Sequence, residues 1–219
     1  MSPDTTPVSD QAAALKGSSP SPRDLAPGAQ NAQVLPGGSP KSTLVAGDPF
    51  PEGNLLTAQG EPTTFAQAVG GKASVVVFYR GAWCPVCNLA LRTYNETLSA
   101  PLRDLGVELV AISPQKPDGS LTMKEKNQLE FTVLSDPGNQ IAGQLGILSR
   151  QSDEQVASDK ASGFDIEEIN ADGTATLTFP TTSLVRADGT IEWIDVHLDY
   201  TTRSEPAEIL SAVHSLLGK

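Results

Sequence analysis

The spacing of apolar residues changes once in the middle of the chain, and this change predicts a strand that runs directly into a helix. Residues 75–79 (VVVFY) form a continuous run of β-forming residues, which is typical of a strand buried on both faces of a sheet. From Val86 to Leu105, apolar residues recur every three or four positions, as they do on one face of a helix. We therefore predict a strand at 73–79 and a helix at 87–105.

The segments on either side of this pair extend it into an α/β pattern. Residues 107–113 (VELVAIS) predict a second buried strand, so that strand, helix and strand form one right-handed βαβ unit. Residues 181–196 predict a hairpin that turns at Ala187-Asp188-Gly189. The other predicted elements are, in chain order, an edge hairpin after Leu44, a helical fragment at 64–69, a helix at 121–130, a strand at 131–136, a helix at 138–147 and a final helix after Glu205.

Two segments lack a clear period. Residues 149–176 carry many charged and small side chains, so we predict an insertion with at most one short helix and a turn at Asp172-Gly173. Residues 1–40 are rich in Ser, Pro, Gly, Ala and Gln, and we predict a flexible N-terminal arm with one short helix, Asp10–Lys16. The alternative is an arm that covers the active site or contacts a second subunit. A single domain, residues 41–219, is expected to follow the arm.

Composition and charge exclude two classes of partner. The chain of 219 residues carries 15 basic and 26 acidic residues, and its net charge of -11 opposes binding to nucleic acid or to an anionic membrane surface. No apolar stretch approaches the roughly 20 residues that a membrane-spanning helix needs. The first residues show no pattern of a secretory signal, so we expect a soluble, cytoplasmic protein.

The only two cysteines, Cys84 and Cys87, lie at the predicted junction of strand and helix. A disulfide between them closes so short a loop that it removes little entropy from the unfolded chain, which disfavours a structural bridge. The start of a helix offers free amides and partial positive charge to a thiolate, and Arg80 adds a full charge nearby. A second thiol one turn away can attack a sulfenic acid or a mixed disulfide formed at the first. The pair is therefore suited to reversible redox chemistry.

Structural interpretations of the same residues are weaker. Two buried structural thiols would not explain why the pair lies beside Gly81, Trp83 and Pro85. A zinc site needs four ligands, and only His197 and His214 are available to help the two cysteines. We assign no function to either histidine and predict no metal or other cofactor.

Several segments in a fixed order resemble a known family. FYRGAWCPVC, VAISPQKPDGS, VLSDPGNQIAGQLGI and FPTTSLVRADGTIEWIDVHLDYTTRSEPAEIL are similar to the peroxiredoxin-like branch of the alkyl hydroperoxide reductase and thiol-specific antioxidant superfamily, over roughly residues 44–217. The resemblance implies a thioredoxin-like α/β fold of the peroxiredoxin type, with a central mixed sheet and helices on both faces. It also implies a thiol peroxidase that reduces hydrogen peroxide or small organic hydroperoxides, takes electrons from thioredoxin, glutathione or another thiol, and in some members forms a homodimer.

The resemblance assigns roles to the cysteines by position. Cys87 stands nine residues after Phe78, where typical peroxiredoxins place the peroxidatic cysteine, and Cys84 stands where they have a threonine. The pair also resembles the thioredoxin motif, which gives the reverse order, with Cys84 as nucleophile and Cys87 resolving. We favour Cys87 as peroxidatic and Cys84 as resolving, and the reverse order stays open.

Five further residues complete the candidate site. Pro180 resembles the cis-proline that faces the cysteine pair in thioredoxin-like proteins, and it stands where typical peroxiredoxins have a peroxide-binding arginine. Arg80 replaces a family proline, and Arg203 resembles an arginine of many members, with a helix-start ion pair as its alternative. Trp83 directly precedes Cys84, and Pro85 directly follows it, between the two cysteines.

Two other functions fit the cysteine motif. One is a thiol-disulfide oxidoreductase that acts on protein or glutathione disulfides, favoured by a CxxC before a helix and by Pro180. The other is a redox sensor without turnover, which would use the same scaffold.

Overall fold

The computed structural model describes residues 6–17 and 44–219 of the chain. Its helices are α1 (Val8–Gly17), α2 (Phe65–Val69), α3 (Pro85–Asp104), α4 (Pro117–Lys126), α5 (Gln140–Leu145), α6 (Asp153–Ala161), α7 (Ile166–Ile169) and α8 (Pro206–Leu216). Its strands are β1 (Leu55–Thr57), β2 (Pro62–Thr63), β3 (Ser74–Phe78), β4 (Glu108–Ser113), β5 (Thr132–Ser135), β6 (Leu148–Arg150), β7 (Thr176–Thr178), β8 (Thr181–Val185) and β9 (Ile191–Val196). No helix of this part of the chain is long and apolar enough to cross a membrane.

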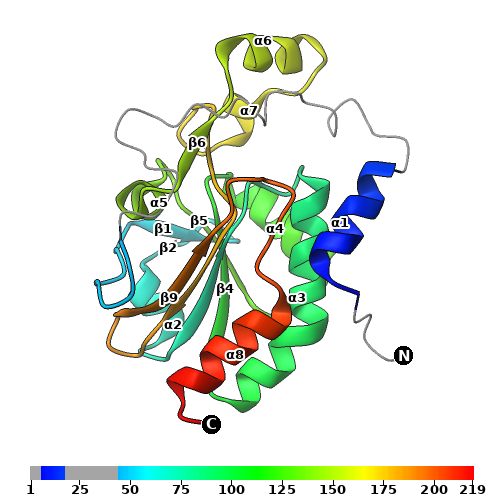
Figure 1. The fold of residues 1–219 in the computed structure, drawn as a ribbon. Helices are drawn as coiled ribbons and strands as arrows, with labels where there is room; N and C mark the ends of the chain where they lie inside the picture. The colour runs from blue at the N-terminus through cyan, green and yellow to red at the C-terminus, as the bar shows by residue number, and fades with distance from the viewer. Residues whose placement is uncertain (1–5, 18–43) are drawn as a thin grey trace.

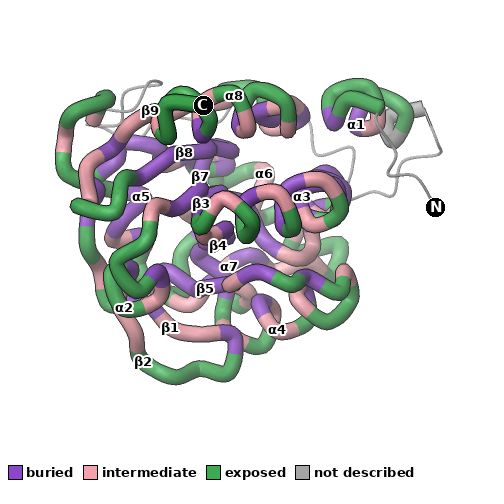
Figure 2. Tube along the Cα trace, turned by 90° about the horizontal axis from the view of Figure 1, so that it is seen from below, coloured by how far each residue is buried: buried purple, intermediate pink, exposed green. Residues whose placement is uncertain are grey.

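The centre of the fold is a mixed sheet of seven strands in the order β2-β1-β5-β4-β3-β8-β9. Strands β3, β4 and β5 are parallel, and the others join antiparallel. Helices α3, α4 and α8 cover one face of this sheet, and α2 and α5 cover the other (Figures 1 and 2). This arrangement confirms the predicted thioredoxin-like α/β fold with helices on both faces.

Alternate residues of β3 supply the two cores. Val75 and Val77 pack with α3 and α8 on one face, whereas Val76 and Phe78 pack with α2 and α5 on the other. Because both faces are covered, the strand is apolar from Val75 to Phe78, and all five of its residues, including Ser74, are buried. The predicted βαβ unit and the hairpin of β8 and β9 are also confirmed.

Two predictions about helices were wrong. Helix α4 begins at Pro117 rather than at residue 121, because proline is compatible with the first position of a helix. The segment 149–176 is more ordered than predicted, since it forms β6, α6, α7 and the start of β7. Helix α6 buries none of its side chains, so it has no apolar face that the sequence could reveal.

Of the predicted N-terminal arm, the structure describes residues 6–17, and the rest lies outside the described residues. The predicted short helix is present as α1, which packs on α3 (Figure 1). Val8 and Ala12 are buried in the same core as α3. The backbone N–H groups of Val8 and Ser9 donate to the Glu205 carboxylate, at 2.8 and 3.0 Å. One end of the arm is therefore bound to the loop that precedes α8.

Candidate active site

The two cysteines lie at the start of α3, the helix that follows β3. Cys84 is the N-cap residue of α3, Pro85 is its exposed first residue, and Cys87 lies in its first turn. Both thiols are free and buried, with exposed fractions of 2 % for Cys84 and 0 % for Cys87. Pro85 suits this position because its missing N–H would have no partner in the first turn. The predicted placement of the pair at a helix start is confirmed.

The loop before the cysteines is held by the side chains of Gln115 and Asn88, and Asn88 is itself held by Asn127. The Gln115 side chain, just after β4, accepts a hydrogen bond from Ala82 N at 2.6 Å. Asn88 Nδ2 donates to the carbonyl oxygens of Ala82 and Cys84, at 2.7 and 2.9 Å. Asn127 Nδ2 in turn donates to Asn88 Oδ1 at 2.9 Å. These bonds fix the backbone that carries the pair.

Gly81 is required at the bend of this loop. Its φ is +151°, and a Cβ there would clash with Trp83 Nε1 and with Gln115 Oε1. Any other residue would therefore displace either the indole or the side chain that holds Ala82.

Arg203 contacts Cys87 directly. Its Nη2 donates to Cys87 Sγ at 3.2 Å, and its Nη1 donates to the carbonyl oxygens of Tyr200 and Thr202 at 2.7 and 2.6 Å. Arg203 makes no ion pair with a carboxylate of the described residues, so the alternative of a helix-start ion pair is wrong. The buried guanidinium has Cys87 as its anionic partner.

The surroundings shift the pKa values of the two thiols in opposite directions. Burial alone would raise the pKa of Cys87, but the hydrogen bond from Cys84, the charge of Arg203 and the backbone N–H of Arg80 outweigh it and lower that pKa to about 5. The pKa of Cys84 is raised well above its ordinary value, because its thiol donates to Cys87 and because it is buried. At neutral pH, Cys87 is therefore the thiolate and Cys84 the thiol.

A polar network that the sequence did not reveal holds the loop of Arg203. Ser204 Oγ donates to Asp195 Oδ2 at 2.7 Å, and the same carboxylate oxygen lies 2.8 Å from His197 Nε2. The other ring nitrogen of His197 lies 2.8 Å from Thr202 Oγ1, and Tyr94 Oη donates to Ser204 O at 2.6 Å. The only signal available was the close spacing of these polar residues around Arg203, which is also common in ordinary loops.

Arg80, which directly follows β3 and Tyr79, is the second arginine near the pair. Its guanidinium carbon is 4.8 Å from the centre of the Trp83 ring and 4.9 Å from that of Tyr200, a spacing that allows cation–π contact with both. Trp83 also packs against Phe164, which precedes α7, with ring centres 5.0 Å apart. The ordered insertion therefore covers the indole next to Cys84, above the end of the sheet where α3 begins (Figure 1).

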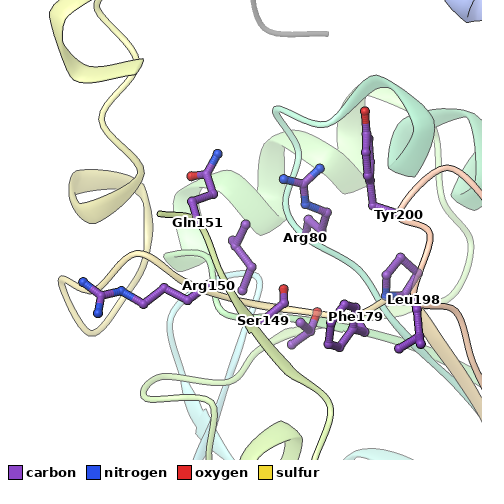
Figure 3. Close-up of a pocket in the computed structure, with 10 residues that line it drawn as sticks. Arg80, Ser149, Arg150, Gln151, Phe179, Leu198 and Tyr200 are labelled. Carbon is purple, nitrogen blue, oxygen red and sulfur yellow. The ribbon is translucent and has the colours of Figure 1, made fainter. Parts of the chain in front are cut away.

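Pro180 does not have the predicted cis peptide bond. The described residues contain no cis peptide, and the chain passes in the trans form from β7 into β8, where the Pro180 carbonyl accepts from His197 N at 2.8 Å. The trans isomer is the intrinsically favoured one for a bond that precedes proline. Pro180 lines a pocket with Arg80 (Figure 3).

No group of three or more His, Cys, Asp or Glu side chains in residues 6–17 and 44–219 is placed to hold a metal ion. The site as described consists of two thiols, two arginines and their polar supports.

Comparison with known proteins relates this site to thiol peroxidases. Residues 46–194 match the model of the AhpC/TSA family. Peroxiredoxin Bcp of Escherichia coli (strain K12) is 31 % identical over 109 residues, which cover 50 % of this chain and 69 % of that protein.

Solved structures are similar in fold at lower identity. The peroxiredoxin-like protein from Aquifex aeolicus matches with a TM-score of 0.62 and 17 % identity, over 82 % of this chain and 90 % of its own. Reduced Prx3 of Vibrio vulnificus, in complex with hydrogen peroxide, matches with a TM-score of 0.61 and 17 % identity, over 78 % of this chain and 99 % of its own.

Proposed function

The chain belongs to the AhpC/TSA family and is a peroxiredoxin-like thiol peroxidase, and from this premise we propose that Cys87 and Cys84 are its peroxidatic and resolving cysteines. The proposed substrates are hydrogen peroxide and small organic hydroperoxides. The observation that supports these roles is the hydrogen bond of 3.2 Å from Arg203 to Cys87 Sγ. A guanidinium in this position stabilises a thiolate, and Arg203 makes this contact with Cys87.

In the first step the Cys87 thiolate attacks one oxygen of the peroxide. The S–O bond forms as the O–O bond breaks, so that Cys87 becomes a sulfenic acid and the second oxygen leaves as water or an alcohol after taking a proton. Negative charge moves from sulfur to the leaving oxygen during this step. Arg203 is held by two backbone carbonyls and is thus oriented in advance to stabilise that charge.

In the second step Cys84 attacks the sulfenic sulfur of Cys87. An S–S bond forms and the oxygen leaves as water, which gives a disulfide between the N-cap residue and the first turn of α3. Cys84 is the N-cap residue and Cys87 lies in the first turn of the same helix, so the pair is close enough for this step with little rearrangement. An external thiol, thioredoxin or glutathione among them, then returns both cysteines to the reduced state.

Peroxide trapping tests the roles. Cys84→Ser protein treated with one equivalent of hydrogen peroxide should form a sulfenic acid at Cys87, detected by mass spectrometry after labelling with a sulfenic-acid reagent. Cys87→Ser protein should stay unlabelled at Cys84 under the same conditions. The reverse pattern would show that Cys84 is the nucleophile.

Disulfide exchange with a protein substrate is less well supported. Its usual nucleophile is the first cysteine of the motif, but Cys84 is buried and its pKa is raised. The ring of Trp83 and the insertion that packs on it also restrict the approach of a bulky disulfide. A sensor without turnover would consume one equivalent of peroxide even with excess thiol, so peroxide consumption by the wild-type protein in excess peroxide and thiol distinguishes it from a peroxidase.

The chain's setting is proposed from the same premise. We place it in the cytoplasm, where thiol reductants keep cysteines reduced, and a homodimer is compatible with the family.

A further inference from the structure

One pocket is lined by a buried cation, Arg80, that makes no ion pair with a carboxylate in residues 6–17 and 44–219. Arg80 lines this pocket and is only 8 % exposed. Its guanidinium stacks with two aromatic rings but makes no hydrogen bond or ion pair with a carboxylate of the described residues. Aromatic faces attract the charge but leave the N–H donors at the guanidinium edge unused. A buried arginine of this kind is suited to accept an anion.

The same pocket presents an unused acceptor. Gln151 is 6 % exposed, and its Nε2 donates to Asp159 Oδ2 at 3.1 Å. Its Oε1 is buried without a hydrogen-bond partner among the described residues. Figure 3 shows the polar ends of Gln151 and Arg80 on the same side of the pocket, above an apolar floor that includes Phe179. A carboxylate with an amide or ammonium N–H nearby would satisfy both groups.

The pocket is small. Its cavity volume is about 20 Å³. This space suits a single carboxylate group. The remainder of a ligand would lie over the rim, where Leu198 is exposed. The dimensions therefore favour a flexible small molecule that inserts one charged end.

The pocket lies on the Cys84 side of the pair. The Arg80 guanidinium stacks on the ring of Trp83, the residue directly before Cys84, whereas the Arg203 guanidinium contacts Cys87. A ligand whose carboxylate contacts Arg80 thus has its other end nearer Cys84.

The disulfide of the catalytic cycle should be reduced at Cys84. An attacking thiolate binds one sulfur and expels the other, and the sulfur with the lower thiol pKa leaves faster. Arg203 stabilises Cys87 as a thiolate, so Cys87 is the better leaving group and Cys84 is the sulfur attacked.

We propose that the Arg80 pocket binds the carboxylate of a small anionic thiol, of which glutathione is the probe, and that this thiol reduces the Cys84–Cys87 disulfide. The inference rests on the proposed function, since it takes this disulfide as the oxidised state. The first thiolate forms an S–S bond with Cys84 and releases the Cys87 thiolate. A second thiolate attacks the sulfur of the bound thiol, so that the two external thiols leave as their own disulfide and Cys84 takes a proton. Two thiols are oxidised for each disulfide reduced.

The test measures reduction apart from the peroxide step. Protein is oxidised with diamide, and its reduction is followed by stopped-flow fluorescence, for which Trp83 next to Cys84 is the reporter. Rate constants per thiolate are compared for glutathione and for its diethyl ester, which lacks both carboxylates. We expect glutathione to react about tenfold faster, the factor that one charge-assisted hydrogen bond supplies.

Variants assign this preference to Arg80. Arg80→Met should lower the glutathione rate to that of the ester, and Arg80→Lys should restore part of the difference. Arg150→Met is the matched control, because Arg150 also lines the pocket but extends away from it in Figure 3 and pairs with Asp153 at 2.9 Å. Arg150→Met should keep the wild-type ratio of the two thiols.

Three results would overturn the inference. The first is that glutathione and its ester reduce the wild type at equal rates. The second is that Arg80→Met keeps the wild-type ratio of these two rates. The third is that the preference for a carboxylate depends on Arg80 in the oxidation step, with acidic hydroperoxides, and not in the reduction step. Failure of the proposed function has a different signature. In that case peroxide does not form the Cys84–Cys87 disulfide, while diamide-oxidised protein still prefers glutathione.

Discussion

Arg203 Nη2 and Cys87 Sγ are joined by a hydrogen bond of 3.2 Å between residues 116 positions apart in the chain. The two groups belong to different elements, since Cys87 lies in the first turn of α3 and Arg203 in the loop before α8. The site is therefore assembled only when this loop folds onto the start of α3, and the network of Asp195, His197 and Ser204 holds it there. Reactivity at Cys87 should depend on the position of Arg203 as well as on its charge.

Removal of the Arg203 guanidinium should raise the pKa of Cys87 and slow its reaction with peroxide. A hydrogen bond to a charged group contributes about 1.5–3 kcal/mol, so Arg203→Met should lower the second-order rate with hydrogen peroxide by roughly tenfold to a hundredfold. Arg203→Lys should lose less, because it keeps the charge without the two-pronged geometry. Stopped-flow fluorescence measures the rate, and thiolate absorbance at 240 nm measures the ionisation.

Arg186→Met is the control for this prediction. Arg186 is a half-exposed arginine that pairs with Glu192 in the hairpin of β8 and β9. It should leave both the rate and the absorbance titration unchanged. An Arg203→Met protein that is folded by circular dichroism and reacts at the wild-type rate would contradict the role given to Arg203.

The pH dependence of the peroxide reaction should report the same thiol. The folded-state pKa of Cys87, about 5, lies below its ordinary value of 9.0. The rate should thus be constant near neutral pH and fall about tenfold per pH unit well below pH 5, as the thiolate is protonated. A rate that instead falls steadily below pH 9 would show an unperturbed thiol.

The same shift links ionisation to stability. Because the pKa is lowered in the folded state, the Cys87 thiolate stabilises the reduced protein at pH values above about 5, increasingly up to the ordinary value of 9.0, and this contribution is lost as the pH falls through 5. Urea unfolding of reduced wild type and Cys87→Ser between pH 4 and 7 measures it. The stability difference between the two proteins should move in favour of the wild type as the pH rises.

Local sequence patterns predicted where the cysteines lie but not the contact between Arg203 and Cys87. Residues 75–79 and the helical period after Val86 are short-range signals, and they placed Cys84 and Cys87 correctly. The contact of Arg203 with Cys87 depends on the path of a distant loop, which no local period encodes. For the same reason the sequence left open whether Arg203 served an ion pair or the site.

Two other features were hidden for different physical reasons. Helix α6 has no buried residue, so its sequence shows no apolar period and predicted a charged loop. The isomer of Pro180 was inferred from a resemblance, whereas the strand pairing around it accommodates the trans form. Resemblance to a family thus predicted the fold correctly but not the isomer of a single peptide bond.

Glu205 should control the docking of the N-terminal helix. Its carboxylate accepts from Val8 N and Ser9 N, two groups at the start of α1 that have no partner within the helix. Loss of such a cap costs about 1 kcal/mol, so Glu205→Ala should increase hydrogen exchange in residues 8–14 by roughly fivefold. Mass spectrometry of peptic peptides measures this exchange.

A double-mutant comparison separates the cap from other roles of Glu205. In protein that lacks residues 1–17, Glu205→Ala should cost less stability than in the full chain, because its partners on α1 are gone. Glu154→Ala, an exposed acidic residue in the first turn of α6, is the control and should leave exchange in residues 8–14 unchanged. Equal costs of Glu205→Ala in the two backgrounds would show that its carboxylate does not hold α1.

Gly119 and Gly143 form a matched pair that tests how the cysteine loop is supported. Both lie inside helices, α4 and α5, and neither has a positive φ. A Cβ at Gly119 would overlap the side-chain amide of Gln115, whereas one at Gly143 meets only Leu148 Cδ1 at 3.7 Å, an ordinary contact. Gly119→Ala should therefore displace Gln115 and remove its bond to Ala82 N, at a cost of about 1–3 kcal/mol. Gly143→Ala should stabilise by about 0.5–1 kcal/mol through helix propensity alone.

Urea unfolding of both variants measures these opposite effects, and a further variant identifies their cause. With Gln115→Ala already present, the added Cβ at Gly119 has no amide to displace, so Gly119→Ala should then cost less than half of its cost in the wild type. Because Gln115 holds the loop before Cys84, Gly119→Ala should also slow the peroxide reaction of Cys87, whereas Gly143→Ala should not. If Gly119→Ala destabilises equally in both backgrounds, the clash lies elsewhere in α4 and Gln115 is not the residue through which Gly119 acts.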